Sequence, residues 1–143
     1  MSVFTQAFYD RMSGDATLTA LLGTYGGAPS VLTKRPLPQN FTVGANGPYV
    51  LTTGSASGGG GPADVKNSSG REIVRDILAF TSLDASPALV DSIADRIFVL
   101  FHRVKVSVTG YTIIVAEALG PIEVDEDDVL GRVVSVRWTL EVN

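Results

Sequence analysis

SPALVDSIADRIFVLF, residues 86–101, shows the clearest structural pattern in the chain. Ser86 is a favoured helix-capping residue, and Pro87 suits the first turn of a helix, where its missing N–H is no loss. Apolar residues then recur every three or four positions and form a wide stripe: Leu89, Val90, Ile93, Ala94, Ile97, Leu100 and Phe101. The pattern predicts an amphipathic helix that buries one side.

Strand patterns follow this helix. A short β-type sequence covers Val104–Val108, and a longer one covers Tyr111–Ala118 before Gly120-Pro121 ends it. Because Tyr111–Ala118 is apolar on both faces, we expect it to be a central strand. The last segment alternates strictly between apolar and polar residues, so one of its faces belongs to the core. The apolar members are Val134, Val136, Trp138, Leu140 and Val142.

The part before the helix opens with two short helices. The first is capped by Ser2, and the second is capped by Asp15 and ends at Gly23. Residues 23–48 hold five glycines and four prolines, which indicates an irregular connection with one possible short strand at 31–33. Strands are predicted over 49–53 and 71–80. Between them, residues 54–70 are glycine-rich and polar, and we expect a mobile loop.

The order of elements predicts an α+β fold, with a single mostly antiparallel sheet and its helices packed on one face. At 143 residues, the length favours one domain over residues 1–143. Hydrophobic residues make up 45% of the chain and charged residues only 18%, which is low for a soluble domain. A partner protein could supply part of the missing polar cover.

Composition excludes several classes of function. The chain has no cysteine, so thiol catalysis and Cys-ligated metal sites are ruled out. Its longest uninterrupted apolar run is far too short to span a membrane, and its start lacks the order of a signal peptide, so we expect it to stay inside the cell or inside something assembled there. The net charge of −4 argues against a broadly basic surface for nucleic acids.

The acidity is local. Five of the fifteen acids lie in one short stretch, and the remaining ten nearly balance the eleven Lys and Arg. The five are Glu123, Asp125, Glu126, Asp127 and Asp128. The stretch lacks the glycine and the glutamate of a calcium-binding EF-hand loop, so a solvated loop between two strands is the favoured interpretation. Its functional use would be electrostatic, through pairing with a neighbour's arginines or repulsion of phosphate.

The sequence shows little sign of catalysis. His102 follows the long helix, where a polar or cationic group is favourable by itself. The run Gly58–Gly61 lacks the Lys-Ser or Lys-Thr of a phosphate-binding loop. No serine lies in a G-x-S-x-G elbow. We therefore expect no enzyme activity, no cofactor and no metal, although a small α+β enzyme or ligand-binding domain that uses His102 stays open as an alternative.

The opening FTQAFYDRMSGDATLTALLG, residues 4–23, resembles the start of the phage tail-terminator or tail-completion proteins, which are related to the head-to-tail joining protein of siphophages. The resemblance continues over nearly the whole chain, in the order of its strands and of the helix around Ile93-Ala94-Asp95. The pieces that match near the start are Asp15, Leu18, Leu21, Leu22, Gly23, Arg35-Pro36 to Pro38 and Pro48-Tyr49-Val50.

The resemblance implies a structural role. Proteins of this family form a hexameric ring that caps the tail tube and offers a surface to the head connector. It implies a homo-oligomer in the tail or neck of a virion, assembled in the host cytoplasm, with the tail tube protein and the head–tail connector as partners. DNA would pass through the lumen without specific binding. Another neck or minor tail component is the alternative within the same class.

Candidate interface residues follow from these expectations. They are the five acids of the 123–128 stretch and four arginines: Arg71, Arg75, Arg132 and Arg137.

Overall fold

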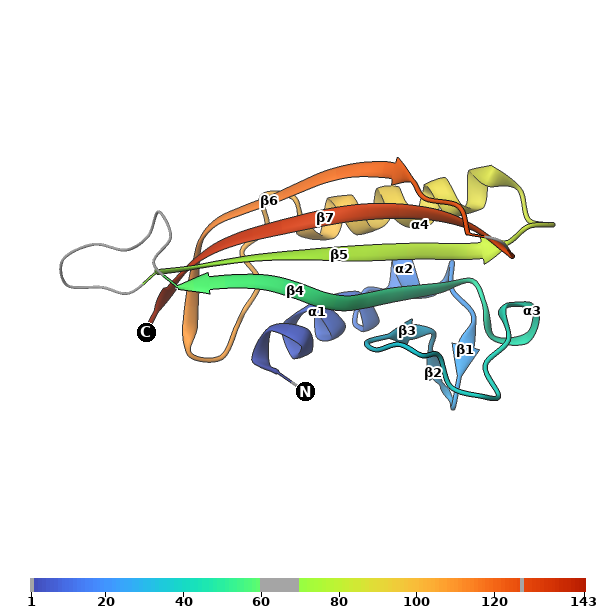
Figure 1. The fold of residues 1–143 in the computed structure, drawn as a ribbon, viewed down its shortest axis with the longest axis horizontal. Coiled ribbons are helices and arrows are strands. Elements are labelled where there is room, and N and C mark those ends of the chain that lie inside the picture. Colours follow the sequence, from blue (N-terminus) through green and yellow to red (C-terminus); the bar gives the residue numbers. More distant parts are fainter. Residues whose placement is uncertain (1, 60–69, 127) are drawn as a thin grey trace.

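A five-stranded sheet and the helix that crosses it form the body of the protein in the computed structural model, which describes residues 2–59, 70–126 and 128–143 (Figure 1). The elements in chain order are α1 (Val3–Ser13), α2 (Ala16–Thr19), β1 (Thr24–Tyr25), β2 (Ala28–Pro29), β3 (Val31–Leu32), α3 (Val43–Asn46), β4 (Tyr49–Gly59), β5 (Gly70–Ser82), α4 (Pro87–Phe101), β6 (Tyr111–Glu123) and β7 (Val129–Val142). The large sheet has the order β3-β4-β5-β7-β6, and β1 pairs with β2 in a separate small sheet.

The predicted α+β class is confirmed, whereas the prediction of a single, mostly antiparallel sheet is corrected to a mixed sheet. The β3 strand runs parallel to β4, and the other neighbours are antiparallel. The parallel contact is possible because the connection over residues 33–48, with α3 in it, is long enough to return the chain to the starting end of β3 before it enters β4. This connection covers one end of the sheet.

The prediction of a central strand over 111–118 is wrong, because β6 lies at the edge of the sheet and β7 takes the place beside β5. Three apolar side chains of β6 are exposed on the side that alternates away from the core: Val115 (42%), Leu119 (69%) and Ile122 (53%). Apolar residues on both faces therefore did not mean burial on both faces. Two register shifts, at Ile113/Val115 and Leu119/Ile122, also break the simple alternation.

Other strand boundaries also differ from those predicted from the sequence. Residues 104–108 form no strand, apart from one bridge between Val108 and Tyr111. Gly120-Pro121 does not end β6, which continues through a bulge to Glu123. The β4 strand runs on to Gly59, opposite Arg71 of β5, so the first residues of the predicted loop are strand. The rest of that prediction, residues 60–69, lies outside the described residues.

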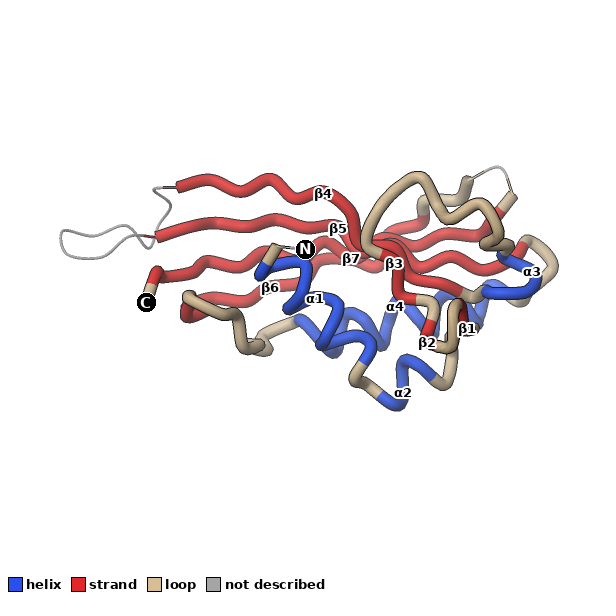
Figure 2. The backbone as a smooth tube through the Cα atoms, turned by 90° about the horizontal axis from the view of Figure 1, so that it is seen from below, coloured by secondary structure: helices blue, strands red, loops and turns tan. Residues whose placement is uncertain are grey.

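The main core lies between the sheet and the two longer helices. Figure 2 shows α1 and α4 beneath the same side of the sheet. Trp138 of β7 is fully buried and stacks on Phe8 of α1 with ring centroids 4.2 Å apart. A second, smaller cluster gathers around Phe80 and Tyr49, which alternate with core residues and so lie on the opposite face of the sheet. Phe41 of the connection before β4 covers this second cluster.

Helix capping follows the sequence closely. Ser2, Asp15 and Ser86 each accept a hydrogen bond from a backbone N–H in the first turn of their helix, as predicted. Asp15 does more than cap α2, because its two carboxylate oxygens accept hydrogen bonds of 2.9 and 2.7 Å from Arg96 of α4. It therefore ties the N-terminal helices to the long helix.

Asp15 also makes the stability of the protein depend on pH. Its pKa lies below the ordinary 3.8, first because Arg96 donates hydrogen bonds to it and also because the Leu18 amide does. A carboxyl group with a lowered folded-state pKa stabilises the fold fully above its ordinary pKa, and this stabilisation is lost as the pH falls through the folded-state value. We expect Asp15→Ala to lower the free energy of unfolding by about 1 kcal/mol at pH 7 through the lost cap alone.

Urea unfolding of the wild type and of Asp15→Ala, followed from pH 7 to pH 2, tests this expectation. The difference between the two proteins should narrow below about pH 4, where the aspartate becomes protonated. A difference that stays constant down to pH 2 would contradict the role of the charge.

Candidate functional site

The acidic stretch forms the turn between β6 and β7. Glu126 and Val129 exchange two backbone hydrogen bonds, of 3.1 and 3.3 Å, and Val124 donates to the Gly131 carbonyl at 3.0 Å. Of the five predicted acids, Asp127 lies outside the described residues. The other four point to different surroundings, so the stretch does not act as one uniform acidic surface.

Asp125 folds back onto its own hairpin. Its carboxylate accepts hydrogen bonds from the Gly131 amide at 2.8 Å and from Arg132 Nη1 at 3.2 Å. These contacts place the pKa of Asp125 below its ordinary value, with the Gly131 amide as the largest cause. Asp125 therefore stabilises the turn.

Arg132 connects this turn to α4. Its guanidinium donates to Asp125 and, at 2.8 Å, to Asp91 Oδ1 of α4, and its side chain is only 11% exposed. Glu123 lies at the exposed end of β6, where its Cα is paired with that of Arg132. Within the described part of the chain, Arg132 thus serves the fold of the hairpin, and this contact is internal to the subunit.

The three other predicted arginines have different environments. Arg71 donates a hydrogen bond to the Tyr111 hydroxyl at 3.0 Å and lies over the ring of Phe4. Arg75 is 6% exposed, and its guanidinium lies 5.2 Å from the centre of the Phe8 ring on the helix side of the sheet. Arg137 is exposed on the other side, where it pairs with Glu72 at 3.2 Å. Of the three, Arg137 is the one that reaches the surface of the open sheet face.

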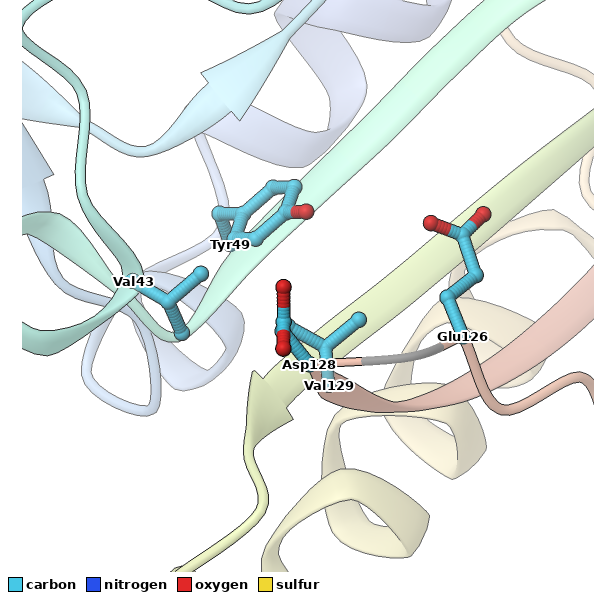
Figure 3. A pocket seen from close by; sticks show the side chains of 5 residues that line it. All are labelled: Val43, Tyr49, Glu126, Asp128 and Val129. Atoms are coloured by element: carbon cyan, nitrogen blue, oxygen red, sulfur yellow. The ribbon is translucent and has the colours of Figure 1, made fainter.

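A pocket of about 510 Å³ separates the turn from the start of β4 (Figure 3). Glu126 and Asp128 supply two carboxylates, Tyr49 supplies a phenol, and Val43 and Val129 supply apolar walls. The pocket brings the acidic turn against residues more than seventy positions earlier in the chain. Figure 3 shows the Tyr49 hydroxyl and both carboxylates around the same hollow.

Arg35 brings a cation to Glu126. Its Nη2 lies 3.2 Å from Glu126 Oε1, and both side chains are about half exposed, so the pair adds little to stability. Burial raises the pKa of the Tyr49 hydroxyl above 10.0, and the charge of Glu126 raises it further. The phenol is therefore protonated and neutral at physiological pH.

Sequence reasoning placed Glu126 and Asp128 among the candidate residues but missed Tyr49 and Arg35. The sequence places Tyr49 at the start of a strand and Arg35 in a proline-rich connection, and both in segments that resemble the tail-terminator family, but it gives neither a place in a site. No pattern in the sequence signals that a connection some fifteen residues long returns to the 126–129 turn. The tertiary structure reveals it through the Arg35–Glu126 pair and the shared pocket lining.

The histidine has a structural position. His102 stacks on Phe98 with ring centroids 4.7 Å apart, and its Nδ1 accepts a hydrogen bond of 3.1 Å from the Ala118 amide at the outer edge of β6. The next residue, Arg103, donates its amide to the Ala116 carbonyl at 3.0 Å. Both contacts cover backbone groups of an edge strand, which would otherwise be open to pairing with another chain.

We expect His102→Ala to lower the free energy of unfolding by about 1 kcal/mol, because the Ala118 amide loses its partner at the strand edge. Assembly or any other biological activity should stay intact. Urea unfolding and a functional assay of the same variant measure the two effects. If His102→Ala remained as stable as the wild type but lost its activity, the assignment of His102 to a structural role would be wrong.

The sheet face opposite α4 is open around β6. A hollow of about 310 Å³ lies there, lined in part by Val74, Leu119 and Arg137. Leu119 and Ile122 are close to each other on this face, since they lie opposite Ser135 and Val133 of β7, whereas Glu117, opposite Arg137, separates Leu119 from Val115. Leu119 and Ile122 therefore form a small exposed apolar patch on β6, and exposed apolar residues that lie together can mark a protein–protein contact.

Metal binding and membrane insertion each require their own structural features. Within the ranges given above, no group of three or more His, Cys, Asp or Glu side chains is placed to hold a metal ion. The described helices include none that is both long and apolar enough to cross a membrane.

Comparison with known proteins adds the fold-level context. By sequence, the chain matches no family model and, at a significant level, no curated protein. In structure it is similar to a chain of the virion of a native gene transfer agent particle, with a TM-score of 0.72 and 19% identity over 96% of this chain and 93% of that chain. A second solved structure is similar with a TM-score of 0.55 and 13% identity, over 99% of this chain and 94% of that chain. The fold is thus one found in a phage-like particle.

Proposed function

We propose that this protein is a structural subunit of a phage-like virion, and that it forms the ring that ends the tail tube and joins it to the head connector. The observation that carries the proposal is the shared fold with a chain of the gene transfer agent virion, which extends over nearly the full length of both chains. The resemblance of residues 4–23 to tail-terminator proteins supports the more specific role. The same resemblance supports a ring of six copies.

The surfaces of the protein suit such a role. In a closed ring, each copy contacts two neighbours through two complementary lateral surfaces. The rotation that relates one copy to the next closes the ring after a fixed number of copies. We assign one of them to the open sheet face at β6, where Leu119 and Ile122 are exposed beside each other. A neighbouring copy would cover these side chains and remove them from water.

Negative-stain microscopy of the purified protein, alone and mixed with tail tubes, tests the proposal. We expect density at one end of each tube and tubes of limited length. Tubes that continue to grow and carry no density at either end would overturn the terminator role. Density at another position in the neck or tail would instead identify the protein as a different component of the same particle.

A further inference from the structure

The pocket beside the β6–β7 turn contains an unusual polar group at its base. The Tyr49 side chain is only 4% exposed, and its hydroxyl, which is not among the fully buried polar atoms, forms no hydrogen bond with another described residue and reaches the open space of the hollow. The hydroxyl of a tyrosine whose ring is buried usually finds a partner at its exposed end, and here that end opens into the pocket. Because the hydroxyl faces the hollow in Figure 3, a group that enters the pocket can supply that partner.

The charge around this hydroxyl is negative. Asp128 forms no ion pair with any described cation, and Glu126 shares one of its two oxygens with Arg35. The Arg35 guanidinium is half exposed and lies at the rim, so it offsets one carboxylate and leaves the second. The group that complements this pocket therefore carries a positive charge.

The shape and the donor set favour a guanidinium over a metal ion. Calcium requires six to eight oxygen ligands, and magnesium a near-ideal octahedron, while the described wall offers two carboxylates and a neutral phenol. A guanidinium has five N–H donors in one plane and can serve two carboxylates and a phenol oxygen together. Val43 and Val129 provide apolar walls for the methylene groups of the side chain.

We propose that this pocket receives an arginine side chain from a partner protein of the particle. The guanidinium donates to Asp128 and to the free oxygen of Glu126, and the Tyr49 hydroxyl accepts a further N–H. That the arginine comes from another protein of the particle rests on the proposed function. That the pocket binds a guanidinium does not depend on it. The pocket would fix the register between two subunits, because charge-assisted hydrogen bonds depend strongly on geometry.

The direct test titrates the isolated protein with N-acetyl-argininamide and follows the NMR signals of Val43, Tyr49 and Val129. Saturable shifts at these three residues are expected, with a dissociation constant in the millimolar range that is typical of a single side chain. The citrulline analogue, which has nearly the same shape and no charge, is the matched control ligand and should leave the signals unchanged. Equal shifts with citrulline, or none with arginine, would overturn the proposal.

Variants locate the binding groups. We expect Glu126→Gln with Asp128→Asn to weaken binding at least tenfold, and Tyr49→Phe to weaken it several-fold. Asp95→Asn with Glu141→Gln removes the same charge elsewhere on the surface and should bind as the wild type does. Unchanged binding in the first double variant would overturn the proposal, as would saturable shifts of the same signals with calcium or magnesium chloride in place of arginine.

Failure of the pocket and failure of the proposed function give different results. The titration needs no particle, so it stands even if the protein caps no tail tube. Conversely, if Glu126→Gln with Asp128→Asn joins particles as well as the wild type does, the role of the pocket in assembly is refuted and the terminator role is untouched.

Discussion

Replacement of Leu119 with glutamate is expected to abolish assembly and to leave the fold intact. Leu119 is 69% exposed on β6, so the change costs the isolated subunit little. In an assembly that covers the open sheet face, the new carboxylate would be buried without a partner, which is strongly unfavourable. The measurement is incorporation of the variant into particles or rings, with circular dichroism and thermal unfolding as the check on folding.

Val99→Glu is the matched control for this prediction. Val99 is also apolar and exposed, at 56%, but it lies on the outer side of α4, away from the patch on β6. A single exposed apolar residue is normal on a protein surface and needs no partner. We expect this variant to assemble as the wild type does. If Leu119→Glu assembled equally well, the assignment of the open sheet face to a subunit contact would be wrong.

Truncation of the tryptophan in the core should have the largest effect on stability. Trp138→Ala is expected to lower the free energy of unfolding by about 3–5 kcal/mol, the range for loss of a large aromatic side chain from a core. The ring is fully buried, stacks on Phe8 and lies near Phe101. Since domains of this size are stable by only about 5–15 kcal/mol, the variant should be close to unfolding at physiological temperature.

Trp138→Phe separates packing from hydrogen bonding. The Trp138 Nε1 is buried, and within the described chain it has no hydrogen-bond acceptor. Replacement of the indole by a phenyl ring therefore breaks no hydrogen bond. We therefore expect this variant to lose much less stability than Trp138→Ala. Urea unfolding followed by circular dichroism suits both variants, because each removes the only tryptophan and with it the usual fluorescence signal. Equal losses in the two variants would contradict this expectation, because they would show that a phenyl ring retains none of the stabilising contacts of the indole.

Helices were predicted more reliably than the positions of strands, because a helix depends mainly on nearby residues. A helix forms its hydrogen bonds within one segment, so caps such as Ser86 and the apolar stripe that follows it are visible in the sequence. A strand forms its hydrogen bonds with segments far away. The pattern of 111–118 identified a strand but placed it in the centre, because nothing in those residues shows that β7 lies between β6 and β5.

The same distinction applies to the candidate site. The acidic residues stood out in the sequence because they are adjacent, yet adjacency on the chain did not give them one role. Asp125 turns inward to Gly131 and Arg132, whereas Asp128 faces the hollow. Alternation along the strand and the reversal at the turn send neighbouring side chains in different directions. Their partners come from other segments, as Arg35 and Tyr49 do.

The sequence by itself determined the α+β class, the three capped helices, the apolar side of β7 and the local acidity of the 123–128 stretch. These features depend on residues a few positions apart. Only the tertiary structure decided that the sheet is mixed, that β6 is an edge strand with an exposed apolar patch, and that a buried tyrosine meets two carboxylates in one pocket. Each of these features depends on which distant segments pack together. The free energy that favours this packing comes from contacts throughout the core and not from any one segment.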